Sequence, residues 1–183
     1  GLYNYKDDTL VVTSYPQWPV QRDCNHNQDK VKVGQYEIWC SEYPNKDAKR
    51  EIPDLGIYFC SSWIDYISPV WSTGTRSGLG FGLSLYPAVF ADWADMDIPD
   101  WEVLCCLVGY ALMNLQQGKQ IEIGCYGGHG RTGTFLACLI AKVEHLDGQT
   151  AVDKVRSAYC SEAIETKKQE ELIKKYAKHV NKS

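Results

Sequence analysis

The clearest hydrophobic pattern in the chain lies between residues 101 and 115. Apolar side chains recur there every three or four positions, at Trp101, Leu104, Cys105, Val108, Leu112 and Leu115. This spacing predicts an amphipathic helix. Asp100 stands where an N-cap residue belongs, and Gly118 stands where a glycine ends a helix.

Three more helices are predicted toward the C-terminus. A helical pattern covers about 131–146 and is closed by Asp147-Gly148. Thr166-x-x-Gln169 resembles a capping box, and Thr150-x-x-Asp153 resembles one more loosely. We therefore expect two further helices that begin near these threonines.

Short strands are predicted between and before the helices. Residues 36–40 and 57–60 are rich in aromatic and β-branched side chains, which is typical of strands. Residues 83–90 resemble another strand despite Pro87, and 121–124 form a short apolar one.

The remaining segments have the composition of loops that connect helices and strands. Residues 44–54 carry charges, two prolines and an asparagine, which predicts a loop, and residues 74–82 are rich in glycine. Residues 1–35 are irregular and polar, with strand character only at 10–12. Strands that alternate with helices, followed by helices alone, predict an α/β three-layer domain with a partly parallel central sheet.

Size and charge narrow the class of protein. The 183 residues suit one compact domain, 1–183, and the net charge of −4 does not call for nucleic acid or an anionic membrane as a partner. The longest apolar stretch, about 103–115, is too short to span a bilayer. The segment 165–183 carries six lysines and three glutamates, which would give a helix there a basic face. A basic helix face is more often solvated than used as a docking surface.

The eight cysteines could form a disulfide framework, but several lie inside apolar runs and no signal peptide is recognisable. We therefore expect a reducing, cytoplasmic setting. No CxxC pair has a second pair or a histidine at zinc spacing, so neither a metal site nor a cofactor is expected.

The glycine-rich segment 125–133, which reads Cys-Tyr-Gly-Gly-His-Gly-Arg-Thr-Gly, joins the last predicted strand to a helix. In such a loop, successive N–H groups and the helix dipole form a cradle for an anion. Arg131 offers a planar fork for two phosphate oxygens, and the same field favours the thiolate form of Cys125. This combination suits cleavage of a phosphomonoester through a phosphocysteine. The alternative is an inert core cysteine beside a glycine turn.

Cys125-x5-Arg131-Thr132 resembles the signature of the cysteine-dependent protein tyrosine phosphatase superfamily, which includes the dual-specificity phosphatases. The superfamily usually has histidine before the cysteine, where this chain has Gly124. The resemblance covers about 88–172, whereas residues 1–85 match no family pattern. It implies that Cys125 is the nucleophile and that phosphate is held by Tyr126, Gly127, Gly128, His129, Gly130 and Arg131.

The departing oxygen of a phosphate ester needs an acid, and residues 91–100 offer four acids in or beside one loop. Trp93-x-Asp95-x-x-x-Pro99 resembles the Trp-Pro-Asp loop of the tyrosine phosphatases, with Ala94 in place of the proline. On this match Asp95 is the general acid and later the base. The alternative is an acidic surface turn.

Other residues carry weaker predictions. The hydroxyl of Thr132 can hydrogen-bond the thiolate and assist its departure, a role compatible with that of a first-turn helix threonine. His129 either reads an anionic substrate or points to solvent. Gln169, within a segment that resembles the dual-specificity phosphatases, either positions the hydrolytic water or only caps a helix. Arg156, upstream of it, is interpreted as structural.

The leading hypothesis is a metal-independent phosphatase acting on phosphotyrosine, with phosphoserine and phosphothreonine as further substrates. A second hypothesis is a pseudophosphatase that binds phosphorylated partners, suggested by Gly124 and Ala94. A third is hydrolysis of a non-protein phosphate, such as a phosphoinositide or an RNA 5′-phosphate, although net acidity argues against nucleic acid. The oligomeric state stays open.

Overall fold

The computed structural model describes residues 2–6, 9–14, 29–42, 53–59, 79–80 and 86–182. The strands over these residues are β1 (Leu2–Lys6), β2 (Thr9–Ser14), β3 (Val31–Val33), β4 (Tyr36–Glu42), β5 (Leu55–Tyr58), β6 (Leu79–Gly80), β7 (Ala88–Phe90) and β8 (Ile121–Cys125). The helices are α2 (Trp101–Gln116), α3 (Gly130–Glu144), α4 (Gly148–Ala158) and α5 (Lys167–Val180).

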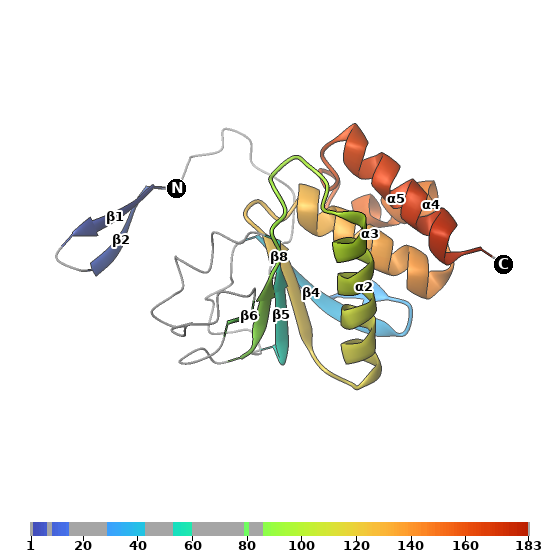
Figure 1. The fold of residues 1–183 in the computed structure, drawn as a ribbon, viewed down its shortest axis with the longest axis horizontal. Helices are drawn as coiled ribbons and strands as arrows, with labels where there is room; N and C mark the ends of the chain where they lie inside the picture. The colour runs from blue at the N-terminus through green and yellow to red at the C-terminus, as the bar shows by residue number, and fades with distance from the viewer. Residues whose placement is uncertain are drawn as a thin grey trace.

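The main sheet has the strand order β3-β4-β8-β5-β7-β6, and β1 pairs with β2 in a separate hairpin. The three central pairings, β4 with β8, β8 with β5 and β5 with β7, are parallel, whereas both edge pairings are antiparallel. The four described helices lie on one side of this sheet (Figure 1). The predicted α/β fold with a partly parallel sheet flanked by helices is therefore confirmed.

Strand β8 lies at the centre of the sheet and is buried along its whole length. Side chains alternate between the two faces of a strand, so Ile121, Ile123 and Cys125 share one face. These three belong to the same apolar core as the inner residues of α2 and α3. Helix α3 is buried from Gly130 to Ala141, and it packs against α2, α4 and α5. The buried centre of the fold therefore carries the predicted loop.

The helix predictions hold with two corrections at the ends. Helix α2 begins after Asp100 and ends before Gly118, whose φ is +79°, but the Asp100 side chain makes no capping hydrogen bond. Helix α3 ends at His145, which adopts the left-handed conformation, so Asp147-Gly148 does not close it.

The cap of α4 also differs from the prediction. Asp147 is its N-cap, and its carboxylate accepts a hydrogen bond from the backbone N–H of Thr150 at 2.8 Å. The predicted Thr150-x-x-Asp153 capping box is therefore wrong, because Thr150 lies inside the first turn. The Thr166-x-x-Gln169 capping box at the start of α5 is confirmed, with both of its reciprocal hydrogen bonds present.

The first and last residues of the strands were predicted less accurately than those of the helices. Strand β5 begins two residues before the predicted 57–60, and within 83–90 the described strand covers only Ala88–Phe90. Residues 1–35 were expected to be irregular outside 10–12, but they contain β1, β2 and β3. Polar residues such as Asn4 and Lys6 interrupt the apolar pattern of β1. Most of the predicted connections 44–54 and 74–82 lie outside the described residues.

Candidate active site

The candidate site begins where the central strand ends. Strand β8 ends at Cys125, residues 126–129 form a loop, and α3 starts at Gly130. The loop thus lies at the carboxyl end of a parallel strand and at a helix N-terminus, where backbone N–H groups favour an anion. Gly128 has φ +72°, a conformation in which a side chain would be strained. The predicted strand, glycine loop and helix N-terminus are confirmed.

Arg131 is buried beneath this loop and is held by two backbone carbonyls. Its Nη1 donates to the carbonyl of Phe59 at 2.8 Å and to that of Trp93 at 2.9 Å. Its Nη2 lies 3.6 Å from Oδ1 of Asp95. These contacts bring together the end of β5, the acid loop and the signature arginine, which are far apart in the sequence.

Two polar atoms in this region are buried and have no hydrogen-bond partner in the structure. They are Nε of Arg131 and the hydroxyl oxygen of Thr132. A buried polar group without a partner is costly, and two such atoms beside a helix N-terminus favour a ligand or a reacting group at this place. A phosphate oxygen suits the guanidinium and a thiolate suits the hydroxyl, so both atoms fit the chemistry predicted for the loop.

The residues of the loop are mostly buried and bonded to their surroundings. Cys125 is only 2% exposed, Tyr126 and Gly127 are half-buried, and Gly128, His129 and Gly130 are buried. The carbonyl of His129 accepts hydrogen bonds from the N–H groups of Gly133 and Ile164, each at 3.0 Å. The imidazole Nε2 of His129 lies 3.8 Å from a carboxylate oxygen of Glu162. His129 therefore does not point to solvent, which was one of the two alternatives.

The fold gives a steric reason for glycine, rather than histidine, at residue 124. It pairs with Ser41 of β4 on one side and with Tyr58 of β5 on the other. A Cβ atom at residue 124 would lie 2.8 Å from Oγ of Ser41 and 3.0 Å from its carbonyl oxygen. The hydroxyl of Ser41 donates to the carbonyl of Ile123 at 3.4 Å. The neighbouring strands thus fill the space that a histidine side chain would need.

The acid loop packs against the site through Trp93. The Trp93 ring is buried and lies 5.2 Å from the ring of Phe59, and its Nε1 donates to the carbonyl of Asp97 at 2.7 Å. The Asp95 side chain is 66% exposed, and its Oδ1 accepts from the N–H of Met96 at 3.0 Å. The structure thus places Asp95 at the rim of the site beside Arg131.

Gln169 connects the acid loop to α5. Its side chain is fully buried, and its Oε1 accepts from the N–H groups of Glu165 and Thr166 at 2.9 and 3.2 Å. Its Nε2 donates to the carbonyl of Asp97 at 3.2 Å. The capping role is therefore present, and the same side chain also contacts the acid loop. Its role in positioning water stays a prediction.

Arg156 has the contacts of a structural residue. Its Nε donates to the carbonyl of Ala163 at 3.0 Å, and its Nη2 donates to the carbonyl of Ile164 at 2.9 Å. The same Nη2 contacts the carboxylate of Glu170 at 2.8 Å. It thus fixes the connection between α4 and α5.

Three residues that shape the site were missed at the sequence level. Phe59 supplies a carbonyl to Arg131, Ser41 fills the space beside Gly124, and Tyr159 donates its hydroxyl to the carbonyl of Gly128 at 2.6 Å. None of them belongs to a local motif, because each reaches the loop only through the strand order or the packing of α4. Pattern alone therefore had no signal for them.

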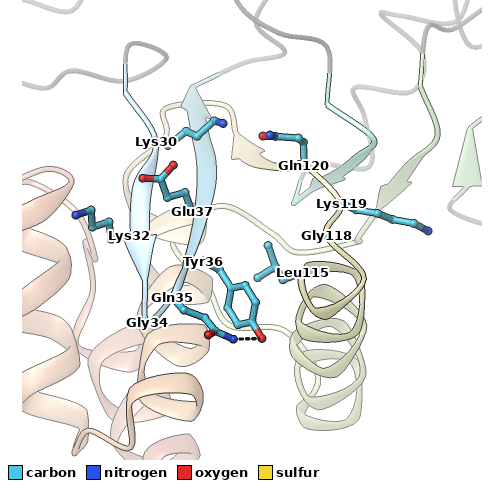
Figure 2. Close-up of a pocket in the computed structure, with 10 residues that line it drawn as sticks. All are labelled: Lys30, Lys32, Gly34, Gln35, Tyr36, Glu37, Leu115, Gly118, Lys119 and Gln120. Atoms are coloured by element: carbon cyan, nitrogen blue, oxygen red, sulfur yellow. Dashed lines mark hydrogen bonds between the residues drawn. The ribbon is translucent and has the colours of Figure 1, made fainter.

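A cavity of about 530 Å³ lies at the opposite end of β8 from Cys125. It lies between the β3–β4 hairpin and the end of α2, and Gln120, directly before β8, is part of its lining (Figure 2). Figure 2 shows the side chains of Lys32 and Lys119 pointing in different directions, so they do not converge on one anion. This cavity is separate from the loop at Cys125.

The cysteines of the described residues differ in their pairing. Cys105, Cys106, Cys125 and Cys138 are free thiols, whereas Cys160 is disulfide-bonded. Burial, and secondarily Cys105, raises the pKa of Cys138, so that this thiol stays protonated. Within the described residues, no group of three or more His, Cys, Asp or Glu side chains could hold a metal ion. Likewise, no described helix has the length and apolar character needed to cross a membrane.

No family model matches the chain. Two uncharacterized proteins of Methanocaldococcus jannaschii are each 34% identical to it over 93 residues, which is half of this chain. The match spans 60% of the length of one relative and 56% of the other.

Solved structures give a clearer comparison. Tk-PTP in its active form superposes with a TM-score of 0.62 at 20% identity, covering 81% of this chain and 96% of that one. PTPMT1 gives 0.64 at 16% identity, covering 82% and 95%, and it has also been solved in complex with PI(5)P. Kinase associated phosphatase gives 0.57 at 19% identity, covering 80% and 88%. The chain therefore has the protein tyrosine phosphatase fold.

Proposed function

We propose that this chain is a cysteine-dependent phosphatase that hydrolyses phosphomonoesters through a phosphocysteine, and that residues 1–183 form its single domain. The observation that carries the proposal is the arrangement at the end of β8. Cys125 and the anchored Arg131 share one glycine loop, and the Arg131 Nε and the Thr132 hydroxyl are left without protein partners. An inert core cysteine does not explain these two buried polar atoms.

In the first step of the proposed reaction, the Sγ of Cys125 attacks phosphorus, and a P–S bond forms as the bond to the leaving oxygen breaks. Arg131 and the N–H groups of residues 126–130 hold the phosphoryl oxygens. Asp95 gives its proton to the leaving oxygen. The exposed position of its carboxylate, 3.6 Å from Arg131, supports this role.

In the second step, water attacks the phosphocysteine and Asp95 takes its proton, which releases phosphate. The sulfur leaves as a thiolate, and Thr132 donates a hydrogen bond to it. Gln169 would position the water, since its buried amide already lies between α5 and the acid loop. No metal or cofactor takes part in either step.

For the substrate we propose phosphotyrosine in a protein, with phosphoserine and phosphothreonine as further candidates. The described rim of the site carries exposed carboxylates at Asp95, Asp97 and Glu162, partly offset by Lys168, 3.8 Å from Asp97. Such a rim repels a substrate that carries additional phosphates. This disfavours a phosphoinositide, the candidate suggested by PTPMT1 in complex with PI(5)P, and it also disfavours RNA. The third alternative is a pseudophosphatase that only binds phosphorylated partners.

A cytoplasmic location also belongs to this proposal. The free thiols among the described residues, such as Cys125 and Cys138, fit a reducing compartment. The disulfide at Cys160 is of the kind that oxidising compartments favour, so location needs its own measurement in cells.

The decisive experiment measures hydrolysis of an aryl phosphate, phosphopeptides, phosphoinositides and RNA 5′-phosphates by the wild type and by Cys125→Ser, in the presence of EDTA. Cys106→Ser is the matched control, since Cys106 is a free, exposed cysteine on α2. We expect activity on phosphopeptides that is lost in Cys125→Ser and kept in Cys106→Ser. Phosphopeptide binding with no turnover would favour the pseudophosphatase, and full activity of Cys125→Ser would refute the proposal.

A second pair of variants tests the acid. Asp95→Asn should lower kcat while substrate still binds, whereas Asp92→Asn, an exposed neighbour on the same loop, should retain activity. The loss should be roughly 100- to 10,000-fold for a positioned acid. Equal rates for Asp95→Asn and the wild type would assign the acid to another residue.

A further inference from the structure

The connection between α4 and α5, residues 159–166, lies against the glycine loop and contacts it at successive positions. The hydroxyl of Tyr159 donates to the carbonyl of Gly128 at 2.6 Å, and the N–H of Ile164 donates to the carbonyl of His129 at 3.0 Å. A Cβ atom on Gly133 would lie 2.9 Å from Cβ of Ala163. Two consecutive carbonyls of the loop are therefore bonded to this connection.

We propose that Tyr159 is a positioning residue of the phosphate loop, whose hydroxyl holds the Gly128 carbonyl away from the bound oxyanion. The inference deepens the proposed function and rests on it, because it assigns a task within the same site. Tyr159 touches neither the nucleophile nor the substrate in this scheme. It acts through the peptide that follows Gly128.

The physical basis is the planar trans peptide, in which a carbonyl and the next N–H point in opposite directions. When Tyr159 holds the Gly128 carbonyl, the N–H of His129 points away from the α4–α5 connection. Likewise, Ile164 holds the His129 carbonyl, so the N–H of Gly130 also points away from the connection. Both N–H groups are then directed toward an anion in the loop, as an anion-binding nest requires.

The Gly128 peptide is the one that most needs such an anchor. Gly128 has φ +72°, and glycine adopts positive and negative φ about equally readily. The His129 carbonyl accepts two backbone N–H donors, whereas the partner that the structure gives the Gly128 carbonyl is the Tyr159 hydroxyl. Without that hydroxyl, the peptide can rotate and direct its carbonyl oxygen at the phosphate, which repels it.

Tyr159 is itself fixed by the end of α4. It is the C-cap residue, and its N–H donates to the carbonyl of Val155 at 2.9 Å. One turn earlier, Arg156 holds the carbonyls of Ala163 and Ile164, so both ends of the connection are tied to the same helix. A hydroxyl presented from such a rigid support can hold a loop peptide in one orientation.

The test compares Tyr159→Phe with Tyr110→Phe, a control that removes an exposed tyrosine hydroxyl on α2. Binding of inorganic phosphate is measured by calorimetry in the Cys125→Ser background, where no turnover occurs. Hydrolysis of an aryl phosphate is measured separately with Cys125 intact, and the melting temperature reports on folding. We expect Tyr159→Phe to bind phosphate about tenfold more weakly and to lose kcat/KM by at least that factor, while Tyr110→Phe matches the parent.

The outcomes separate this inference from the proposed function. If the wild type does not hydrolyse phosphate esters but Tyr159→Phe still weakens phosphate binding, the proposed function fails and the positioning role stands. If the wild type is active and Tyr159→Phe matches Tyr110→Phe in both measurements, the positioning role is overturned, even where the melting temperature falls. Absence of phosphate binding in the Cys125→Ser parent also overturns it, because there would be no anion cradle to hold.

Discussion

The guanidinium of Arg131 donates a hydrogen bond to the carbonyl of Trp93 at 2.9 Å and so joins the glycine loop to the acid loop. Asp95 follows two residues later, and its carboxylate lies 3.6 Å from the same guanidinium. One buried side chain therefore contacts the acid loop and, in the proposed reaction, also the bound oxyanion. A change at Arg131 should affect both.

Arg131→Lys is the variant that tests this double role. Lysine keeps the charge but loses the planar fork that contacts two carbonyls and a phosphate together. We expect kcat/KM to fall roughly 100- to 1,000-fold, the usual cost of losing a donor that stabilises the transition state. Stability should fall by about 1–3 kcal/mol, because the carbonyls of Phe59 and Trp93 lose a buried donor. Kinetics on an aryl phosphate and urea unfolding measure the two effects, and lower stability with unchanged kcat/KM would contradict the phosphate role.

Gly124→Ala tests the steric account of the residue before the nucleophile. The added methyl group would lie 2.8 Å from Oγ of Ser41, so we expect a loss of about 1–3 kcal/mol in the free energy of unfolding. Ser41→Ala in the same chain removes that oxygen and should recover part of the loss. Gly109→Ala is the control, because nothing lies within 4 Å of its Cβ position and alanine favours the helix. Equal stabilities of Gly124→Ala and Gly109→Ala by urea unfolding would refute the account.

The parts of the site that could be predicted are those carried by contiguous residues. Residues 125–133 define the loop by themselves, and the apolar period of 3.6 residues predicts α2 before β8 in the sequence and α3 after it. Ser41 and Tyr159 could not be found in this way, because their contacts depend on the register of β4 with β8 and on the packing of α4.

The errors at helix ends have a related cause. Asp147-Gly148 resembles a helix stop, yet a left-handed His145 ends α3, and Gly148 is the first residue of α4. Aspartate and glycine occur at both kinds of helix end, so composition cannot distinguish a stop from a start. The distinction is made by backbone conformation, which becomes fixed only when the two helices pack.

Two variants distinguish the two roles of Gln169, which are capping α5 and contacting the acid loop. Thr166→Ala removes the oxygen that caps α5 but leaves the Gln169 amide free to contact the Asp97 carbonyl. It should cost about 1 kcal/mol of stability with little change in kcat. Gln169→Ala should cost at least as much stability and should also lower kcat, because the Asp97 carbonyl of the acid loop loses its hydrogen bond to α5. If both variants show the same kcat in steady-state assays, Gln169 only caps the helix.

The buried Tyr58 predicts how stability depends on alkaline pH. Its hydroxyl donates to a carboxylate oxygen of Glu122 at 2.6 Å and shares a hydrogen bond of 2.7 Å with Tyr86. Burial, followed by the charge of Glu122, raises the pKa of Tyr58 well above its ordinary value of 10.0. Above about pH 10 the unfolded chain therefore loses a proton that the folded chain keeps, so stability falls as pH rises.

Tyr58→Phe should remove the part of this pH dependence that comes from the Tyr58 hydroxyl. We expect its free energy of unfolding to be lower than that of the wild type near neutral pH, because Glu122 loses a buried donor. Between about pH 9 and about pH 11 its stability should fall less steeply than that of the wild type, which urea unfolding at a series of pH values measures. Tyr110→Phe, on the exposed face of α2, should keep the wild-type slope. Identical slopes for Tyr58→Phe and the wild type would mean that the Tyr58 hydroxyl ionises in the folded chain as it does in the unfolded one.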